Sequence, residues 1–288
     1  MSINLENVYY TYSKGTPFQQ QALKGVSLAI AKGEFVAIIG HTGSGKSTLV
    51  QHLNGLLKPE AGKASIDGID LSRKGSESKA ARQQVGMVFQ YPEHQIFAET
   101  VYEDIAFGPR NKGFNEEEVD KAVREAMAFV GLDFDTFAQR SPFQMSGGQM
   151  RRVAIAGVVA MNPDYLVLDE PSAGLDPRSR NAVFREIMAL HKSRGIAIVL
   201  VTHSMEEAVG YADRLLVISE GKVLFDNSPA VIFKDHEKEL LAVGADIPQV
   251  YKLASLLRSR GLSLPENLKD PKALAKAILA AKEGKHAK

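Results

Sequence analysis

One loop carries the clearest structural signal in the chain: Gly40-His41-Thr42-Gly43-Ser44-Gly45-Lys46-Ser47. It matches the P-loop pattern G-x-x-x-x-G-K-[ST], in which successive backbone N–H groups wrap around phosphate oxygens. The preceding residues 35–39 form a continuous apolar run, which is typical of a strand buried on both faces. We expect a helix to begin at Ser47, so that its N-terminus also faces the phosphates.

This loop and the start of the helix supply the predicted nucleotide-binding residues. We expect Lys46 to reach the β- and γ-phosphates as a point charge and the Ser47 hydroxyl to ligate Mg²⁺. The phosphate-binding chemistry does not require His41. We interpret His41 as a spacer whose side chain faces the solvent or the base. The predicted set is Gly40, His41, Thr42, Gly43, Ser44, Gly45, Lys46, Ser47 and Thr48.

A second apolar run, residues 165–168, ends in the carboxylates of Asp169 and Glu170. Ligands of open α/β sheets bind at the carboxyl ends of the strands, so both acids should face the phosphate loop. We predict that Asp169 holds Mg²⁺ through its water shell and that Glu170 orients and polarises the attacking water. The alternative is that the two acids only cap the following segment.

The order of apolar patterns along the chain predicts the fold class. Strands are expected at residues 3–10, 22–30, 35–39, 85–89, 165–168, 197–201 and 215–218, and helices at 117–130, 178–194 and 205–212. Their alternation predicts an α/β fold: a P-loop NTPase core with a mainly parallel sheet, helices on both faces and an antiparallel β edge subdomain. Residues 3–10 alternate between apolar and polar, and we expect them to form an edge strand.

Two segments depart from this alternation. Residues from about 97 to 160 show a helical pattern and no strong strand pattern, which predicts an inserted helical subdomain. We expect residues 1–240 to form one nucleotide-binding domain and residues 241–288 a helical C-terminal extension with a polar, frayed tail. In the extension, one helical face carries Val250, Leu253 and Leu257, and another carries Leu274 and Ile278. These apolar faces are either a surface for a partner or a local core.

Composition limits the classes of function. The chain has 288 residues, of which 44% are hydrophobic and 24% charged, as in a globular protein. A net charge of +1 does not indicate a nucleic-acid partner, and the lack of Cys excludes disulfides and cysteine-based metal sites or nucleophiles. With no apolar run of about 20 residues and no signal-peptide pattern, we expect a soluble, intracellular chain that can still dock on a membrane partner.

Among P-loop proteins, the segment Met145-Ser146-Gly147-Gly148-Gln149 narrows the choice. It resembles the signature loop of ATP-binding cassette (ABC) ATPases, with Met where Leu is commonest. The Ser146 hydroxyl and the amides of Gly147 and Gly148 form an anion-binding helix start. The resemblance implies that Ser146, Gly147, Gly148 and Gln149 cover the ATP of a second subunit, in a head-to-tail dimer with two sandwiched ATP molecules.

The resemblance to ABC ATPases covers residues 1 to about 235 and implies further roles. Gln90 fits the Q-loop, which contacts Mg²⁺ or water and senses the membrane partner. Asp176 lies in the D-loop, which communicates across the dimer, and His203 fits the switch histidine that contacts the γ-phosphate. The implied catalytic residues are Gln90, Glu170 and His203. The implied Mg²⁺ ligands are Ser47, Gln90 and Asp169.

Tyr12 fits the aromatic residue that stacks on adenine in this family. An aromatic ring offers a flat apolar face to a purine base. Tyr9 and Tyr10 lie close to it in the sequence, and either of them is an alternative.

The segment 89–111 indicates a subfamily. Its Pro-Glu pair after Gln90 and its run Phe107-Gly108-Pro109 resemble the second-type ATPases of energy-coupling factor (ECF) transporters, which import vitamins and metal ions. The resemblance implies a peripheral protein on the cytoplasmic face of the cell membrane. Its partners would be a first-type ATPase in a heterodimer, a transmembrane T component and a substrate-binding S component, with no nucleic acid. The alternatives are an ATPase of another ABC importer and a soluble ABC ATPase without a membrane partner.

Three charged residues near these motifs have less specific patterns. We hypothesise that Glu93 supplies negative charge to a basic residue on a coupling helix of the T component. The alternative is a solvated loop acid. Arg151 and Arg152 follow the signature helix start, which favours structural or dimer-facing salt-bridge partners over a basic patch.

Overall fold

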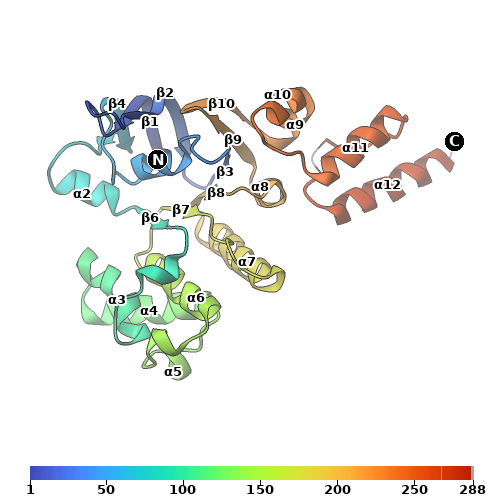
Figure 1. Cartoon of the computed structure of the whole chain (residues 1–288). Helices are drawn as coiled ribbons and strands as arrows, with labels where there is room; N and C mark the ends of the chain where they lie inside the picture. Colours follow the sequence, from blue (N-terminus) through green and yellow to red (C-terminus); the bar gives the residue numbers. More distant parts are fainter. Residues whose placement is uncertain (267, 287–288) are drawn as a thin grey trace.

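A computed structural model describes residues 1–266 and 268–286 of the chain (Figure 1). Within these residues a six-stranded sheet forms the centre of the molecule. Its strands lie in the order β10 (Lys222–Asn227), β9 (Arg214–Ser219), β3 (Phe35–Ile39), β8 (Ala197–Val201), β7 (Tyr165–Asp169) and β6 (Val85–Val88). Neighbours from β9 to β6 are parallel, and β10 pairs antiparallel with β9. The predicted α/β fold with a mainly parallel sheet is confirmed.

Strand β3, which leads into the P-loop, is buried on both faces, as its continuous apolar sequence predicted. Phe35, Ala37 and Ile39 belong to the core that the sheet shares with the large helices. Val36 and Ile38 belong to a second core, which the sheet shares with an antiparallel sheet above it. The alternation of side chains along the strand therefore holds the end of β3 between two packed layers.

The second sheet has the strand order β2 (Gln20–Ala31), β1 (Ser2–Tyr12), β4 (Ala61–Ile66) and β5 (Ile69–Asp70) in the described residues. The prediction that residues 3–10 form an edge strand is wrong, because β1 pairs with β2 on one side and with β4 on the other. Its alternating pattern arises because one face of the sheet packs on the core. An antiparallel strand shows that pattern whether it is central or at an edge.

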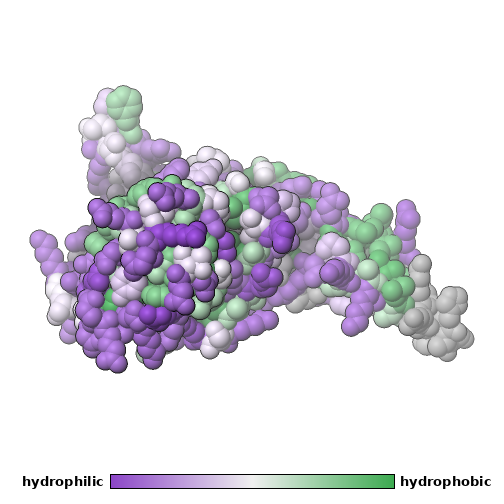
Figure 2. Space-filling view, turned by 90° about the horizontal axis from the view of Figure 1, so that it is seen from below, coloured by the Kyte–Doolittle hydropathy of each residue, from purple (hydrophilic) through white to green (hydrophobic). Residues whose placement is uncertain are grey.

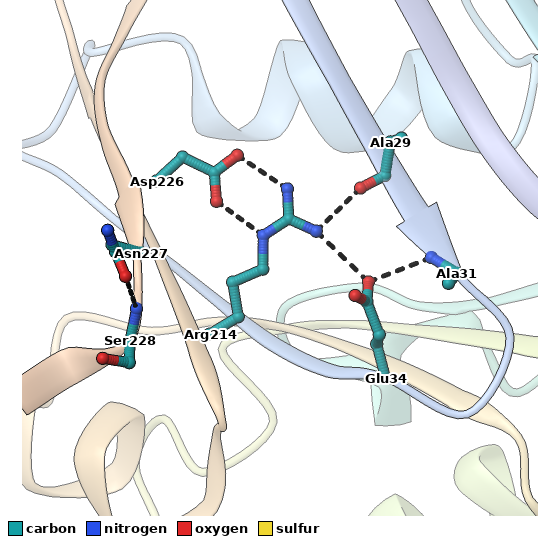
Figure 3. Close-up of polar contacts among 7 residues, drawn as sticks. All are labelled: Ala29, Ala31, Glu34, Arg214, Asp226, Asn227 and Ser228. Carbon is teal, nitrogen blue, oxygen red and sulfur yellow. Dashed lines mark hydrogen bonds and ion pairs between the residues drawn. The ribbon is translucent and has the colours of Figure 1, made fainter.

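Arg214, at the start of β9, joins the two sheets (Figure 3). Its guanidinium donates two hydrogen bonds to the Asp226 carboxylate on β10, at 2.5 and 2.6 Å. Its Nη1 donates to the Ala29 carbonyl oxygen on β2 at 2.9 Å and to the Glu34 carboxylate at 3.2 Å. The hydrogen bonds to Asp226 raise the pKa of Arg214. The hydrogen bond to Ala29 joins β2 to the central sheet.

Helices cover the central sheet. The three helices predicted at 117–130, 178–194 and 205–212 are confirmed as α4 (Glu116–Phe129), α7 (Pro177–Arg194) and α8 (Met205–Tyr211). The helix after the P-loop begins at Lys46, one residue before the predicted start. Before residue 249, the α-helices outside residues 97–160 are α1 (Lys46–Leu53), α2 (Ser76–Arg82), α7 (Pro177–Arg194), α8 (Met205–Tyr211), α9 (Pro229–Asp235) and α10 (Glu237–Ala242).

The chain between β6 and β7 forms a helical group that lies on the opposite side of the central sheet from the antiparallel sheet (Figure 1). It consists of η1 (Pro92–Gln95), α3 (Val101–Lys112), α4 (Glu116–Phe129), α5 (Phe134–Phe137), η2 (Pro142–Gln144) and α6 (Gly147–Val159). The sequence fixes where its α-helices start, because each begins after a polar side chain that accepts a backbone N–H. These N-cap residues are Thr100, Asn115, Asp133 and Ser146.

The C-terminal part forms α11 (Gln249–Ser259) and α12 (Pro271–His286) at one end of the molecule (Figure 1). Ala254, Leu264, Leu268 and Leu274 build a small buried core there. Four of the five residues predicted to share helical faces belong to it or pack against it: Val250, Leu257, Leu274 and Ile278. Leu253 and Leu256 stay about half exposed, and hydrophobic residues gather at this end (Figure 2). The polar tail includes residues 287–288, which lie outside the described residues. No helix in the described chain is long and apolar enough to cross a membrane.

Candidate functional site

Most of the predicted nucleotide-binding residues line a pocket of about 300 Å³ at the carboxyl ends of β3 and β7. This is the edge of the sheet where open α/β folds bind ligands. Its lining comes from the P-loop, the start of α1, the antiparallel sheet and three segments that follow central strands. The lining residues are Tyr12, Gln20, Ala22, Thr42, Gly43, Gly45, Lys46, Ser47, Thr48, Gln90, Glu170 and His203.

Two glycines of the P-loop are required by close packing of the backbone. A Cβ at Gly40 would lie 2.2 Å from the Ile218 carbonyl oxygen, and one at Gly45 would lie 2.6 Å from that of Ala22. Gly45 also has φ +106°, in the region that favours glycine, and it is the N-cap of α1. Only glycine fits at these two positions, because the backbones of Ile218 and Ala22 lie so close. This close packing holds the loop in place, with the N-terminus of α1 at the pocket.

Lys46 places a buried cation at this helix start. Its ammonium donates to the Gly40 carbonyl oxygen at 2.7 Å and to that of His41 at 3.0 Å. Burial lowers the pKa of Lys46, and the nearby charges of Glu170 and Asp169 partly oppose this effect. A phosphate group in the pocket would stabilise the charged form in the same way as the two carboxylates do.

Glu170 lies between two other predicted catalytic residues. Its Oε1 is 2.7 Å from Nε2 of His203, and its Oε2 accepts a hydrogen bond from Nε2 of Gln90 at 2.9 Å. The Glu170 backbone has φ +49°, a conformation that costs a residue with a side chain about 1 kcal/mol or more. Its N–H donates to the Val201 carbonyl oxygen at 2.9 Å, which anchors it to β8. Three segments that are far apart in sequence thus converge on one carboxylate.

Asp169, at the end of β7, provides oxygen ligands suited to Mg²⁺. Burial raises its pKa, repulsion by Glu170 adds to this, and Lys46, His203 and a hydrogen bond from the Ser47 hydroxyl oppose it. A divalent cation would relieve the repulsion between the adjacent carboxylates. No group of three or more His, Cys, Asp or Glu that could hold a metal exists in the described chain. A hydroxyl and a carboxylate fit Mg²⁺ because this ion usually completes its shell with water and substrate phosphates.

Of the three tyrosines considered for the base, Tyr12 is the one that lines the pocket. Its hydroxyl lies 3.2 Å from Oγ1 of Thr48. Tyr10 packs edge-on against Tyr12 and against His52, with ring centroids 4.9 and 5.0 Å apart. Tyr9 lies elsewhere, with its hydroxyl against Gly25.

Three predicted loop residues do not line the pocket: Gly40, His41 and Ser44. His41 is exposed, with Nδ1 2.8 Å from the Thr42 carbonyl oxygen and Nε2 3.5 Å from the Ser219 hydroxyl. Its position agrees with the spacer interpretation. Ser44 is buried, and its hydroxyl has no hydrogen-bond partner among the described residues.

The signature segment and the D-loop residue lie outside this pocket. Ser146 caps α6 and exchanges hydrogen bonds with Gln149: the Gln149 N–H donates to Oγ of Ser146 at 3.3 Å, and Oε1 of Gln149 accepts the Ser146 N–H at 3.0 Å. A Cβ at Gly147 or Gly148 would meet no heavy atom within 4 Å in the described chain, so this helix start is open to an incoming group. Asp176 is exposed and caps α7 by accepting two backbone N–H groups.

The structure corrects the hypothesis for Glu93. Its carboxylate accepts hydrogen bonds from Nε and Nη2 of Arg151 at 3.0 and 2.9 Å, and its side chain is 15% exposed. It is therefore neither a free charge for a coupling helix nor a solvated loop acid. The expectation that Arg151 is a structural salt-bridge partner is confirmed. Arg152 instead makes long contacts of 3.4 Å with the carbonyl oxygens of Val130 and Gly131.

Sequence reasoning missed Glu207, a buried carboxylate on α8. Its Oε1 accepts the Ser172 hydroxyl at 2.6 Å, and its Oε2 accepts the Thr202 hydroxyl at 2.7 Å. It thus joins the loop after Glu170 to the loop that carries His203. The sequence offers no signal that separates Glu207 from its exposed neighbour Glu206.

Comparison with known proteins agrees with this geometry. Residues 23–173 match the family model described as "ABC transporter", and the chain belongs to this family of ATP-binding cassettes. The match to a family model and the residues around the pocket identify it as an ABC ATPase.

Its relatives are more specific. The energy-coupling factor transporter ATP-binding protein EcfA2 of Clostridium tetani is 50% identical over 268 residues, which are 93% of each chain. The protein with the same description from Symbiobacterium thermophilum is 47% identical over 287 residues, or 99% of each chain. The resemblance to second-type ECF ATPases that the sequence suggested is confirmed.

Solved structures agree as well. A structure of cbiO1 from Clostridium perfringens, described as part of the ABC transporter complex cbiONQ, has a TM-score of 0.72 and 35% identity. It covers 88% of this chain, and this chain covers 98% of it. A dimeric post-hydrolysis structure of the ATP-binding cassette MJ0796 bound to ADP and Pi has a TM-score of 0.70 and 32% identity over 78% of this chain.

Proposed function

We propose that this chain is the ATP-hydrolysing subunit of an ECF-type importer, which couples the reaction ATP + water → ADP + phosphate to uptake of a vitamin or metal ion. The observation that carries the proposal is Glu170, held between Gln90 and His203 beside a P-loop pocket. The relatives that match nearly the whole chain are described as ECF ATP-binding proteins.

In the proposed reaction each residue of the pocket has one task. Lys46 and the N-terminus of α1 bind the phosphates. Ser47, Asp169 and Gln90 would hold Mg²⁺, which would supply positive charge to neutralise the phosphates. Glu170 orients the attacking water and takes its proton, while His203 contacts the γ-phosphate and fixes the Glu170 carboxylate. Tyr12 stacks on the adenine base.

We further propose that the pocket is completed by a second ATPase subunit. Its support is the position of the signature segment Ser146–Gln149, which lies on α6 outside the chain's own pocket and is open on its glycine face. In a head-to-tail dimer, this segment covers the ATP of the partner and Asp176 lies at the boundary. A first-type ECF ATPase is the proposed partner, in a heterodimer with two ATP molecules between the subunits.

A groove on the helical group supports a membrane partner. It is lined by apolar and polar residues that include Gln95, Phe97, Phe107 and Met161. Phe97 and Phe107 are more than half exposed and pack edge-on, with ring centroids 4.9 Å apart. We propose that a coupling helix of a transmembrane T component docks here. The chain then lies on the cytoplasmic face of the membrane, and an S component selects the substrate.

For the domain organisation we propose a cassette of residues 1–240 with a helical subdomain at 97–160, and an extension of residues 241–288 that stabilises the dimer. Support for the last role comes from the apolar groove between α11 and α12, where Leu253 and Leu256 are about half exposed. An exposed apolar face of this kind is typical of a protein interface.

The test is to purify the tagged chain from detergent-solubilised membranes of its own cells and identify the proteins that accompany it. A second cassette ATPase, a polytopic T-like protein and small membrane subunits would support the ECF proposal. Transmembrane subunits with an extracytoplasmic binding protein would indicate another class of ABC importer. A chain found only in the soluble fraction would overturn the transport proposal and leave the ATPase chemistry intact.

A further inference from the structure

Arg151 on α6 carries a buried charge that the ATPase mechanism does not use. Its side chain is 3% exposed, and its guanidinium donates two hydrogen bonds to Glu93 on η1. Its Nη1 donates to the Ala173 carbonyl oxygen at 2.7 Å and lies 3.3 Å from that of Pro171. One side chain on α6 therefore contacts two other segments: one that lies 58 residues before it in the sequence and one that lies about 20 residues after it.

The partners of Arg151 lie on the two segments that directly follow Gln90 and Glu170, which we call the catalytic pair. Gln90 lies in the loop between the end of β6 and Glu93, and Glu170 directly precedes Pro171. The amide of Gln90 donates to the Glu170 carboxylate at 2.9 Å, so the two segments start in contact. Arg151 joins them a second time, a few residues farther along each chain segment.

Tyr91 packs beside this junction. It has φ +54°, and its ring lies 5.9 Å from the guanidinium carbon of Arg151 and stacks on His94. A Cβ added at Gly174 would lie 3.9 Å from the Tyr91 ring, so the segment after Glu170 passes close to the segment after Gln90.

The chemistry of the pair favours arginine at this position. Burial alone would raise the pKa of Glu93, but hydrogen bonds and the charge of Arg151 lower it, so the carboxylate stays ionised at neutral pH. A guanidinium can bind a carboxylate with two N–H groups and still donate to carbonyl oxygens with the others. Lysine has the same charge but cannot hold this planar arrangement.

We propose that Arg151 is a positioning residue that holds residues 91–95, residues 171–175 and the start of α6 together as one unit. This inference rests on the proposed function, in which the catalytic pair serves this chain's ATP and the signature segment serves the partner's ATP. The signature segment ends two residues before Arg151 on the same helix. A change at one ATP site would then move the segment that serves the other site, because a single side chain connects them.

Hydrogen exchange of the purified full chain tests the connection without a partner subunit. We expect Glu93→Gln to increase amide exchange in residues 171–175, although Glu93 contacts none of them in the hydrogen bonds described, because the substitution weakens the anchor of Arg151. Arg151→Lys should increase exchange in both 91–95 and 171–175. Arg152→Lys is the matched control and should change neither, since Arg152 contacts only Val130 and Gly131 by hydrogen bonds in the described chain. Circular dichroism melting verifies that each variant is folded.

Steady-state hydrolysis by the native assembly gives the second readout. Arg151→Lys should lower kcat by about tenfold or more, because small misplacements of catalytic groups have effects of this size. The Kd of the isolated chain for a fluorescent ATP analogue should change by less than about twofold. Unchanged exchange of residues 171–175 in Glu93→Gln, or wild-type kcat in Arg151→Lys, would overturn the inference. A wild-type assembly that does not hydrolyse ATP would refute the proposed function instead, and the exchange experiment would still decide whether Arg151 joins the segments.

Discussion

Nε2 of His203 lies 2.7 Å from Oε1 of Glu170, although the two residues belong to loops after different strands of the central sheet. Gln90 binds the other oxygen of the same carboxylate at 2.9 Å. A carboxylate held at both oxygens has a fixed orientation, which is what a base needs to face an attacking water. The positions of His203 and Gln90 therefore matter for hydrolysis even before either touches a phosphate.

The first prediction concerns Glu170. In Glu170→Gln the amide fills the same space but cannot take a proton, so ATP binding should persist while turnover falls by about a hundredfold or more. Rapid-quench measurement of phosphate formation by the assembled ATPase checks the turnover, and fluorescence titration with an ATP analogue checks binding. Hydrolysis near the wild-type rate would remove Glu170 from the role of base.

The second prediction concerns stability. Asp169 is buried beside Glu170, and burial followed by this repulsion raises its pKa. Asp169→Asn removes a carboxylate that destabilises the folded chain when ionised and keeps an oxygen that accepts the Ser47 hydroxyl. The variant should therefore melt a few degrees higher than the wild type at neutral pH without Mg²⁺, and it should lose Mg²⁺-dependent hydrolysis.

The pH dependence of this gain has a definite sign. Because the folded-state pKa of Asp169 is above its unfolded value, the wild type loses stability as pH rises through the interval between the two values. The difference in melting temperature between Asp169→Asn and the wild type should therefore shrink toward acidic pH, where Asp169 is protonated in both states. A difference that grows on acidification would contradict the assigned environment of Asp169.

The third prediction concerns Tyr12, the tyrosine that lines the pocket. Tyr12→Ala should weaken ATP binding by about fivefold or more, because an aromatic ring stacked on a base contributes about 1–3 kcal/mol. Tyr12→Phe keeps the ring, loses only the contact with Thr48, and should bind almost as the wild type does. Tyr9→Phe is the control outside the pocket. Equilibrium titration with ATP and with inorganic triphosphate checks the assignment, since triphosphate binding should be insensitive to all three substitutions.

Local patterns predicted the strands and the pocket residues of this fold well. Continuous apolar runs such as residues 35–39 identify buried central strands because both faces of each strand are covered. The short strand β4 was missed, because Ala61, Gly62 and Lys63 are exposed and show no apolar pattern. A local pattern also could not predict that β1 lies between two strands, because this position depends on pairing with the distant residues 61–66.

The same limit applies around the site. Motif spacing selected Gln90, Glu170 and His203, and the structure brings all three together. The bond between Glu93 and Arg151 spans 58 residues, and neither residue's own sequence neighbours indicate the other. Long-range polar pairs of this kind depend on how the helical group packs against the sheet, which a single sequence does not display.

The fourth prediction concerns Glu207, which joins Ser172 and Thr202 by hydrogen bonds of 2.6 and 2.7 Å. Glu207→Ala leaves two hydroxyls without their acceptor in a buried place, which should lower the free energy of unfolding by about 1–3 kcal/mol. Because Ser172 follows Glu170 and Thr202 precedes His203, kcat should fall by about tenfold while the Kd for ATP stays nearly unchanged. The exposed neighbour gives a matched control, and Glu206→Ala should behave as the wild type in urea unfolding and in phosphate release. If the two variants are equally active, the bridge through Glu207 is structural and does not hold the catalytic loops in register.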